Sequence, residues 1–292
     1  MSMVLNENEV QEILDLIRRA GEEILKIYFQ EQADWKVSLK EDRTPITEAD
    51  RLANDIINEG LKKLFPDIPI ISEENREVSY DIRREYECCW LLDPLDGTKE
   101  FLKQNGEFTV NLALIQQGKP VAGFISVPVK GLFYFAVKGE GAYKIEIGEK
   151  RQGGQSERQI KQVKQDNKLQ LRAAQFSMDD AGLTVLASRS HFDGETRKFI
   201  ESLNQPRLES RGSSLKFMML AEGLGHLYPR LGRTMEWDTA AGQAILEEAG
   251  GQVVEFFTRH PLHYNKESLV NPPFLATAAL SSDGREIARS KR

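Results

Sequence analysis

The N-terminal part of the chain repeats apolar residues at helical spacing. Residues 8–29 place apolar side chains three or four positions apart, from Val10 to Tyr28, which predicts an amphipathic helix. After a polar loop, the same spacing resumes behind Thr47 and ends near Pro66, which predicts a second helix. The first helix carries nothing that suggests chemistry, so we expect it to serve packing.

Shorter apolar runs broken by Gly and Pro follow, and they have the length of β-strands. In the first half of the chain these runs cover residues 69–72, 89–92, 108–115, 121–127, 132–137 and 142–147. The last four follow one another through short turns, which predicts an antiparallel meander. We therefore expect an α+β first half with an antiparallel sheet.

The composition changes at residues 149–168, where Gln and Lys dominate and apolar residues are rare. Such a stretch predicts a solvated loop or a short exposed helix. Beyond it, candidate strands alternate with candidate helices, which is typical of an α/β sandwich. The strands cover 183–187, 225–228, 252–256 and 274–278, and the helices cover 193–203, 213–222 and 239–249. We therefore divide the chain into an N-terminal α+β subdomain, residues 1–168, and a smaller C-terminal α/β subdomain, residues 169–292.

The composition agrees with a folded protein rather than a disordered one. The chain has 292 residues, 40% of them hydrophobic, which is enough to bury a core in each half. Its formal net charge of -6 argues against a broad surface for polymeric nucleic acid. No apolar run approaches the roughly 20 residues of a membrane helix, and the N-terminus lacks the features of a signal peptide. We expect a cytoplasmic protein in which the adjacent Cys88 and Cys89 are buried strand residues rather than a redox pair or a zinc site.

Four acidic clusters lie where elements are expected to meet, at residues 47–50, 72–74, 93–98 and 236–238. The third is the most informative, because an apolar strand ends in Asp93 and Asp96, and Pro, Gly and Thr force a tight turn. We expect both carboxylates to face outward at the carboxyl end of the strand, where ligands of α/β folds usually bind. Carboxylate oxygens suit Mg²⁺, and the amides of Gly97 and Thr98, if they open a helix, can receive a phosphate. The motif therefore predicts a metal-phosphate site.

The other clusters also have purely structural interpretations. Thr47 and Asp50 match a helix capping box. Asp238 suits a helix N-cap, and residues 72–74 alone would be a solvated loop. The turn differs from the Asp-x-Asp-Gly-Thr motif of haloacid dehalogenase phosphatases, since two residues separate its aspartates. The chain also lacks a Walker loop, a G-x-G-x-x-G after a strand and an H-E-x-x-H motif.

Taken together, these motifs resemble the inositol monophosphatase superfamily. Its signatures are an upstream Glu-Glu, an Asp-Pro-[Ile/Leu]-Asp-Gly-Thr turn and a late Trp-Asp-x-Ala-Ala-Gly, and all three occur here in order. Within it, the chain is most similar to the bacterial 3′(2′),5′-bisphosphate nucleotidase branch, and the likeness covers residues 8–280. The segments that carry this likeness are KEDRTPIT from residue 40, ISEE from 71, ASRSH from 187, GSSLKF from 212, LYPR from 227, EWDTAAG from 236 and YNKESL from 264. The hydrophilic stretch 149–168 departs from the family by its length.

The resemblance implies a layered αβαβα sandwich and metal-assisted hydrolysis without a covalent phosphoenzyme. By position in the motifs, two or three Mg²⁺ ions would be held by Glu73, Asp93, Asp96, Asp238 and the backbone carbonyl of Leu95. Asp50 and Thr98 would accept a proton from the attacking water, with Glu73 assisting. The resemblance also implies lithium sensitivity, through replacement of a weakly held Mg²⁺.

The substrate would contact the same turn and a second group of residues. Ser213 and Lys216 lie three apart at an expected helix start, and Arg230 follows an expected strand. Lys216 and Arg230 are therefore placed to bind a second phosphate that is not hydrolysed. The alternative is that they are ordinary charges on a solvated surface. By resemblance, the nucleotide would also contact His191, and the substrate as a whole Glu73, Leu95, Asp96, Gly97, Thr98 and Asp238.

The function implied by the resemblance is removal of the 3′-phosphate from 3′-phosphoadenosine 5′-phosphate, which leaves AMP and clears a by-product of sulfate assimilation. Inositol monophosphatase or fructose-1,6-bisphosphatase activity is the alternative within the class. A phosphate- or nucleotide-binding regulator without turnover is the alternative outside it, and the intact set of acidic residues argues against that role. The sequence leaves open the oligomeric state, the preference between this substrate and its phosphosulfate analogue, and peripheral attachment to the cytoplasmic face of the inner membrane.

Overall fold

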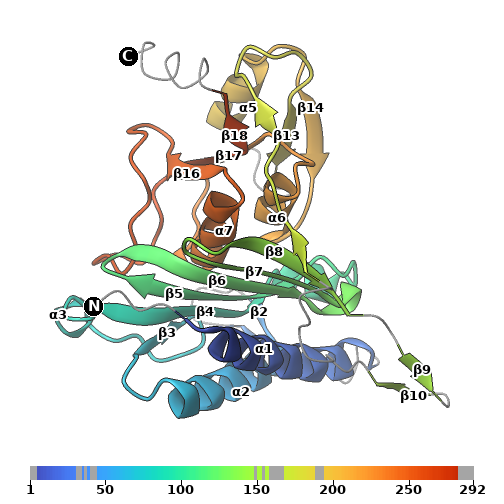
Figure 1. Cartoon of the computed structure of the whole chain (residues 1–292), viewed down its shortest axis with the longest axis vertical. Helices are drawn as coiled ribbons and strands as arrows, with labels where there is room; N and C mark the ends of the chain where they lie inside the picture. The colour runs from blue at the N-terminus through green and yellow to red at the C-terminus, as the bar shows by residue number, and fades with distance from the viewer. Residues whose placement is uncertain are drawn as a thin grey trace.

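The computed structural model describes residues 5–30, 35, 38–39, 45–147, 150–152, 155–157, 168–187 and 194–281. In this part of the chain, helices lie outside, between and beyond two β-sheets (Figure 1). The layered α/β architecture that the resemblance implies is therefore confirmed. His191 and most of the hydrophilic stretch 149–168 lie outside the described residues.

Two helices, α1 (Glu7–Tyr28) and α2 (Glu48–Leu64), cover the outer face of the larger sheet (Figure 1). They correspond to the two helices that the apolar spacing predicts. Their apolar faces share one buried core with the sheet. At Gly60 of α2, an added Cβ would lie 2.3 Å from a methyl carbon of Leu16 in α1. A larger residue at this position would therefore force the buried Leu16 side chain to move.

The larger sheet has seven strands in the order β11-β8-β7-β6-β5-β4-β3. These strands are β3 (Ile70–Ser72), β4 (Cys88–Asp96), β5 (Thr109–Gln116), β6 (Lys119–Val127), β7 (Leu132–Val137), β8 (Gly141–Glu146) and β11 (Leu169–Gln170). The predicted meander is present as β5 to β8, in which each strand pairs antiparallel with the next. Both cysteines lie at the start of β4 and are free thiols; Cys89 is buried as predicted, whereas Cys88 is only half-buried.

The pair formed by β3 and β4 is the parallel exception in this sheet, and it aligns two acidic residues. Ser72 lies opposite Leu92 at the end of the shared register, and the amide of Glu73 still donates to the carbonyl of Leu92 at 3.1 Å. Parallel strands end at the same edge of a sheet. Glu73 and Asp93, the next residues of the two segments, therefore lie side by side at this edge.

The carboxyl end of β4 is irregular. Asp93 lies opposite Asn111 and Asp96 lies opposite Thr109, and the register shifts between these two pairs. The bulge leaves Leu95 outside the ladder, as expected where a strand turns toward a site. Gly97 then adopts a left-handed conformation with φ 96°, and α4 (Thr98–Leu102) begins directly after it. A side chain at residue 97 would be strained in this conformation.

The second sheet has five strands in the order β14-β13-β15-β17-β16. Its elements are β13 (Thr184–Ala187), β14 (Arg207–Ser210), β15 (Leu227–Arg230), β16 (Gln252–Glu255) and β17 (Phe274–Thr277). The helices α6 (Leu215–Ala221) and α7 (Glu236–Glu248) fill the space between the two sheets with a second core. A third, smaller core contains residues of α5 (Gly194–Glu201) and of the second sheet. Whether the halves divided at residue 168 are separate subdomains stays a prediction.

The remaining described elements are short. They are β1 (Ser38–Leu39), β2 (Pro45–Ile46), α3 (Tyr80–Arg83), the 3₁₀ turn η2 (Pro128–Lys130), β9 (Lys150–Gln152), β10 (Gln155–Glu157), β12 (Gln175–Phe176) and β18 (Ala279–Leu280). None of the described helices is both long and apolar enough to cross a membrane.

Several details differ from the expectation. In the stretch 149–168, where a loop or a short exposed helix is expected, β9 and β10 form a short antiparallel pair. The helix α7 begins at Glu236 instead of residue 239, so Asp238 lies inside its first turn and the predicted N-cap at Asp238 is wrong. The cap is Met235, whose amide donates to the Asp238 carboxylate at 2.8 Å. The strand β14 was not predicted, because its apolar residue Leu208 is exposed at the edge of the sheet and leaves no burial pattern.

Candidate active site

Four acidic side chains meet where the edge of the larger sheet faces the start of α7. Glu73 follows β3, Asp93 and Asp96 end β4, and Asp238 lies in the first turn of α7. Their carboxylates are close enough to perturb one another. Burial raises the pKa of Asp93 well above its usual range, and the charges of the other three raise it further.

The same effect extends to the other aspartates of the group. Burial raises the pKa of Asp96 to about 6, although Lys216 opposes the shift. Burial, followed by the charge of Asp96, raises the pKa of Asp238 well above its ordinary value. In this structure the group therefore holds more negative charge than its surroundings neutralise, which is the electrostatic condition for binding a cation.

Each of these three aspartates is oriented by the protein through one carboxylate oxygen. The bonds run from the Leu95 amide to Asp93 Oδ1 at 3.0 Å, from the Ser214 amide to Asp96 Oδ2 at 2.7 Å, and from the Met235 amide to Asp238 Oδ2 at 2.8 Å. Within the described part of the chain, the second oxygen of each accepts no hydrogen bond. An all-oxygen set of this kind fits a hard cation such as Mg²⁺.

The carboxylates are near one another without forming a closed cluster. Among the described residues, no three acidic, histidine or cysteine side chains are gathered tightly enough to hold a metal ion as they stand. A cation bound between these carboxylates would reduce the repulsion between their like charges.

Asp50 lies beside this group, at the start of α2, and it has two sets of partners. Its Oδ2 accepts hydrogen bonds from the amide and the hydroxyl of Thr47, which completes the predicted capping box. Its Oδ1 accepts the hydroxyl of Thr98 at 3.3 Å. Burial raises the pKa of Asp50, and the charge of Glu73 adds to the shift. The capping role and a proton-accepting role are therefore compatible in one side chain.

The amide that orients Asp96 belongs to a polar network that the sequence analysis missed. The Ser214 hydroxyl contacts both Thr109 and Asn111 at 2.8 Å, and Asn111 donates to Asp96 at 3.2 Å. Asn111 is only 1% exposed. A buried amide in the otherwise apolar strand TVNLALIQ is the signal that could have found it, because such a group needs polar partners.

A cavity of about 150 Å³ adjoins Asp96 and Asp238. Gly97, Ser213, Lys216 and Arg230 line it, so the structure brings these predicted substrate residues together beside the acidic group.

Lys216 is only 4% exposed, so its interpretation as a solvated surface charge is wrong. Its ammonium donates to the carbonyls of Arg211 and Ser213 at 3.0 and 2.7 Å and lies over the ring of Tyr228. Burial lowers the pKa of Lys216 to about 8, and Asp96 limits the fall. An ammonium has three N–H donors, so one remains for a ligand in the cavity.

Arg230 and Ser213 present further donors at this cavity. Within the described residues, the buried Arg230 Nε and the buried Ser213 hydroxyl have no hydrogen-bond partner. Ser213 also has a left-handed backbone with φ 43°, which is strained for a residue with a side chain. Buried donors without partners and local strain are both typical of sites that bind a ligand.

Comparison with known proteins places the whole chain among phosphatases. A sequence model described as the Inositol monophosphatase family matches residues 6–287. The 3′(2′),5′-bisphosphate nucleotidase CysQ of Salmonella typhimurium is 40% identical over 268 residues, which are 92% of this chain and 99% of the relative.

Solved structures give the same picture. CysQ from Bacteroides thetaiotaomicron superposes with a TM-score of 0.78 at 40% identity, over 93% of this chain and 97% of that one. An IMPase/NADP phosphatase complexed with Mg²⁺ and phosphate has a TM-score of 0.69 at 17% identity, over 94% of this chain and 90% of that one. The second likeness shows the fold alone.

Proposed function

The chain belongs to the inositol monophosphatase family, and we propose that it is a Mg²⁺-dependent phosphatase that converts 3′-phosphoadenosine 5′-phosphate to AMP and phosphate. The observation that carries this proposal is the 40% identity to bisphosphate nucleotidases over nearly the full length of both chains. The proposal is also supported by the positively charged side chains that line the cavity beside the acidic group. In the cell, this activity would clear a by-product of sulfate assimilation.

We propose that Glu73, Asp93, Asp96, Asp238 and the carbonyl of Leu95 hold two or three Mg²⁺ ions. The Mg²⁺ ions would lower the pKa of the attacking water and stabilise the charge on the leaving oxygen. The raised pKa values of the buried aspartates support this assignment, because a bound cation would stabilise the ionised carboxylates that burial and mutual repulsion disfavour. Because Leu95 lies outside the ladder, its carbonyl is not paired with β5.

We propose that Thr98 and Asp50 receive the proton of the attacking water, assisted by Glu73. The Thr98 hydroxyl donates to Asp50 Oδ1, so it can accept a proton from water while passing its own to the carboxylate. The raised pKa of Asp50 makes it a stronger base than an exposed aspartate. Thr47 holds the other oxygen and so keeps Oδ1 directed at Thr98.

We propose that Lys216 and Arg230 bind the 5′-phosphate, which is not hydrolysed. With a pKa of about 8, most Lys216 side chains still carry their charge at neutral pH. The Arg230 guanidinium supplies a second positive group to the same cavity. Ser213 and Gly97 line the same space, and the proposed nucleotide contact of His191 lies outside the described residues.

The related activities on inositol 1-phosphate or fructose 1,6-bisphosphate use the same metal chemistry and differ in this cavity. Lys216→Met and Arg230→Met distinguish a substrate with a second phosphate from inositol 1-phosphate. Each change removes one positive charge while keeping an apolar stem of similar length. We expect the KM for 3′-phosphoadenosine 5′-phosphate to rise roughly ten- to a hundredfold, because one charge-assisted contact is lost. At saturating Mg²⁺, which offsets the lost positive charge near Asp96, turnover of inositol 1-phosphate should change by less than about threefold, since it has no second phosphate.

Lys144→Met is the matched control, because Lys144 is a half-buried lysine that pairs with Glu222 at 2.9 Å, away from the cavity. It should leave both KM values unchanged. Equal loss on both substrates in the Lys216 and Arg230 variants, with faster wild-type turnover of inositol 1-phosphate, would assign the protein to the inositol phosphatases instead.

A further inference from the structure

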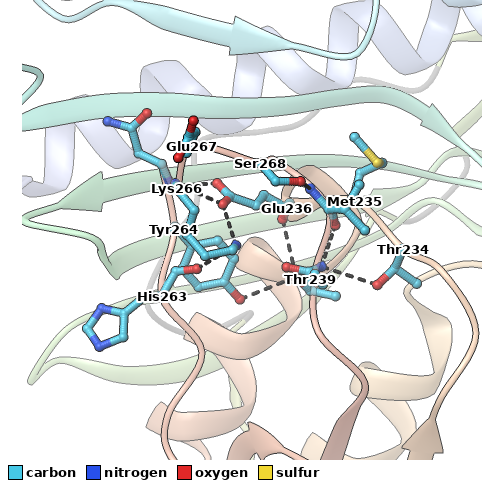
Figure 2. A network of polar contacts seen from close by, with 12 residues as sticks. Thr234, Met235, Glu236, Thr239, His263, Tyr264, Lys266, Glu267 and Ser268 are labelled. Carbon is cyan, nitrogen blue, oxygen red and sulfur yellow. Dashed lines mark hydrogen bonds and ion pairs between the residues drawn. The ribbon is translucent and has the colours of Figure 1, made fainter. Parts of the chain in front are cut away.

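A further buried carboxylate, outside the acidic group described above, lies two residues before Asp238. Glu236 is the first residue of α7 and is fully buried. Its carboxylate accepts the amides of Asn265 and Lys266 and pairs with the Lys266 ammonium (Figure 2). One side chain therefore fixes a distant loop to the first turn of the helix that carries Asp238.

The same loop is held from its other side by Arg83. This guanidinium is 1% exposed and donates to the Asn265 side chain at 2.8 Å and to the carbonyl of Lys266 at 3.0 Å. The Asn265 amide group returns a hydrogen bond to the carbonyl of Arg83 at 2.7 Å. Arg83 also donates to the carbonyl of Val78, in the segment that follows Glu73. The loop thus joins the segment after Glu73 to the start of α7.

A third contact completes the fixation of α7. The Asn271 side chain donates to the carbonyl of Met235 at 2.6 Å and to the hydroxyl of Thr239 at 3.0 Å. The Thr239 hydroxyl in turn donates to the carbonyl of Glu236 (Figure 2). Met235 is the residue whose amide orients Asp238. The position of the Asp238 carboxylate is therefore determined by contacts on both sides of the first turn.

Burying the Glu236 carboxylate costs free energy, because the charge must leave water. A protein with well-packed apolar residues in place of a buried ion pair is often as stable. What a charged, multiply bonded group adds is a fixed geometry. Glu236 lines neither the cavity beside Asp96 and Asp238 nor a second cavity that Glu73 lines, so a direct contact with substrate does not explain its burial.

We propose that Glu236 is a positioning residue for the metal site. By pairing with Lys266 it fixes the first turn of α7, and so holds Asp238 at the spacing from Glu73 and Asp93 that cation binding needs. This inference rests on the proposed function, because it assumes that Asp238 is a metal ligand.

The test uses Glu236→Gln and Lys266→Met in the full chain, with Mn²⁺ as the probe. Binding of Mn²⁺ to the metal-free protein is measured by electron paramagnetic resonance, alongside thermal melting and steady-state kinetics with Mg²⁺. We expect both variants to bind Mn²⁺ roughly tenfold more weakly, as is typical when a group that orients a metal ligand is changed. The kcat at saturating Mg²⁺ and the KM for 3′-phosphoadenosine 5′-phosphate should change by less than about threefold.

The matched control is Glu222→Gln. Glu222 is also a poorly exposed carboxylate with a lysine partner and a second donor, Tyr134, but it lies at the end of α6 away from Asp238. It should lower the melting temperature without changing Mn²⁺ affinity. If Glu236→Gln is destabilised while both it and Lys266→Met bind Mn²⁺ within twofold of wild type, the positioning role is overturned. Failure of the wild type to bind Mn²⁺ would instead overturn the proposed metal site itself.

Discussion

The two oxygens of the Asp50 carboxylate have different partners. Oδ2 takes the capping bonds from Thr47, and Oδ1 takes the Thr98 hydroxyl. The first contact stabilises a helix end, and the second is the one that we propose for proton transfer. Because the tasks use different atoms, a single substitution can separate them.

The substitution Asp50→Asn separates the capping role of this residue from its proposed role in proton transfer. The amide oxygen can still accept the capping bonds, and the NH₂ group can face the Thr98 hydroxyl, so the melting temperature should change little. The amide cannot take a proton, so we expect kcat to fall about a hundredfold or more. Asn6→Ala, which removes the side-chain cap of α1, is the converse control with lower stability and normal kcat. Near-normal kcat in Asp50→Asn would leave Asp50 with a capping role only.

At the scale of elements, the end of β4 and the first turn of α7 bring together carboxylates that are more stable when protonated or bound to a cation than when ionised alone. The pKa values of Asp93, Asp96 and Asp238 are all raised, first of all by burial. A carboxylate with a higher pKa in the folded than in the unfolded state binds protons more tightly when folded. Its contribution to stability is therefore full at low pH and is lost as the pH rises through the folded pKa.

For Asp96 this loss falls between about pH 4 and pH 6, and the raised pKa values of Asp93 and Asp238 act in the same direction. We predict that the melting temperature of the EDTA-treated protein falls between pH 5 and pH 7.5, and that Mg²⁺ restores it at pH 7.5. Asp93→Asn should raise the melting temperature of the metal-free protein at pH 7.5 and weaken its pH dependence, while abolishing turnover. A less stable Asp93→Asn protein at pH 7.5, with the pH dependence intact, would show that these carboxylates do not repel one another.

The elements of the site could be predicted from the sequence where their signal is local. The apolar spacing of α1, the meander β5 to β8 and the Asp93–Asp96 turn each depend on residues within one short segment, and each is present. The sequence predicts the start of α7 three residues too late. Glu236 is buried in its pairing with the distant Lys266, and this contact leaves no pattern in the sequence around residue 236. Similarly, β14 is an exposed edge strand whose pairing with β13 depends on the rest of the sheet.

At the scale of the whole molecule, the site forms where the two sheets and the helices between them meet. Glu73 and Asp93 come from the larger sheet, Asp238 from α7, and Arg230 from the second sheet. The motifs identified these residues one by one through their resemblance to a family. They could not reveal that Ser214 orients Asp96 or that Arg83 holds Asn265, because such contacts join residues more than a hundred positions apart and exist only in the folded chain.

The central claim, that this protein removes the 3′-phosphate from a bisphosphate nucleotide, is tested most directly by identifying its product. The purified protein is incubated with 3′-phosphoadenosine 5′-phosphate and Mg²⁺, and the products are resolved by ³¹P nuclear magnetic resonance. We predict one equivalent of inorganic phosphate and AMP that retains its 5′-phosphate, with no reaction in EDTA. Formation of adenosine 3′-phosphate, or no phosphate release from this substrate while inositol 1-phosphate is hydrolysed, would contradict the account.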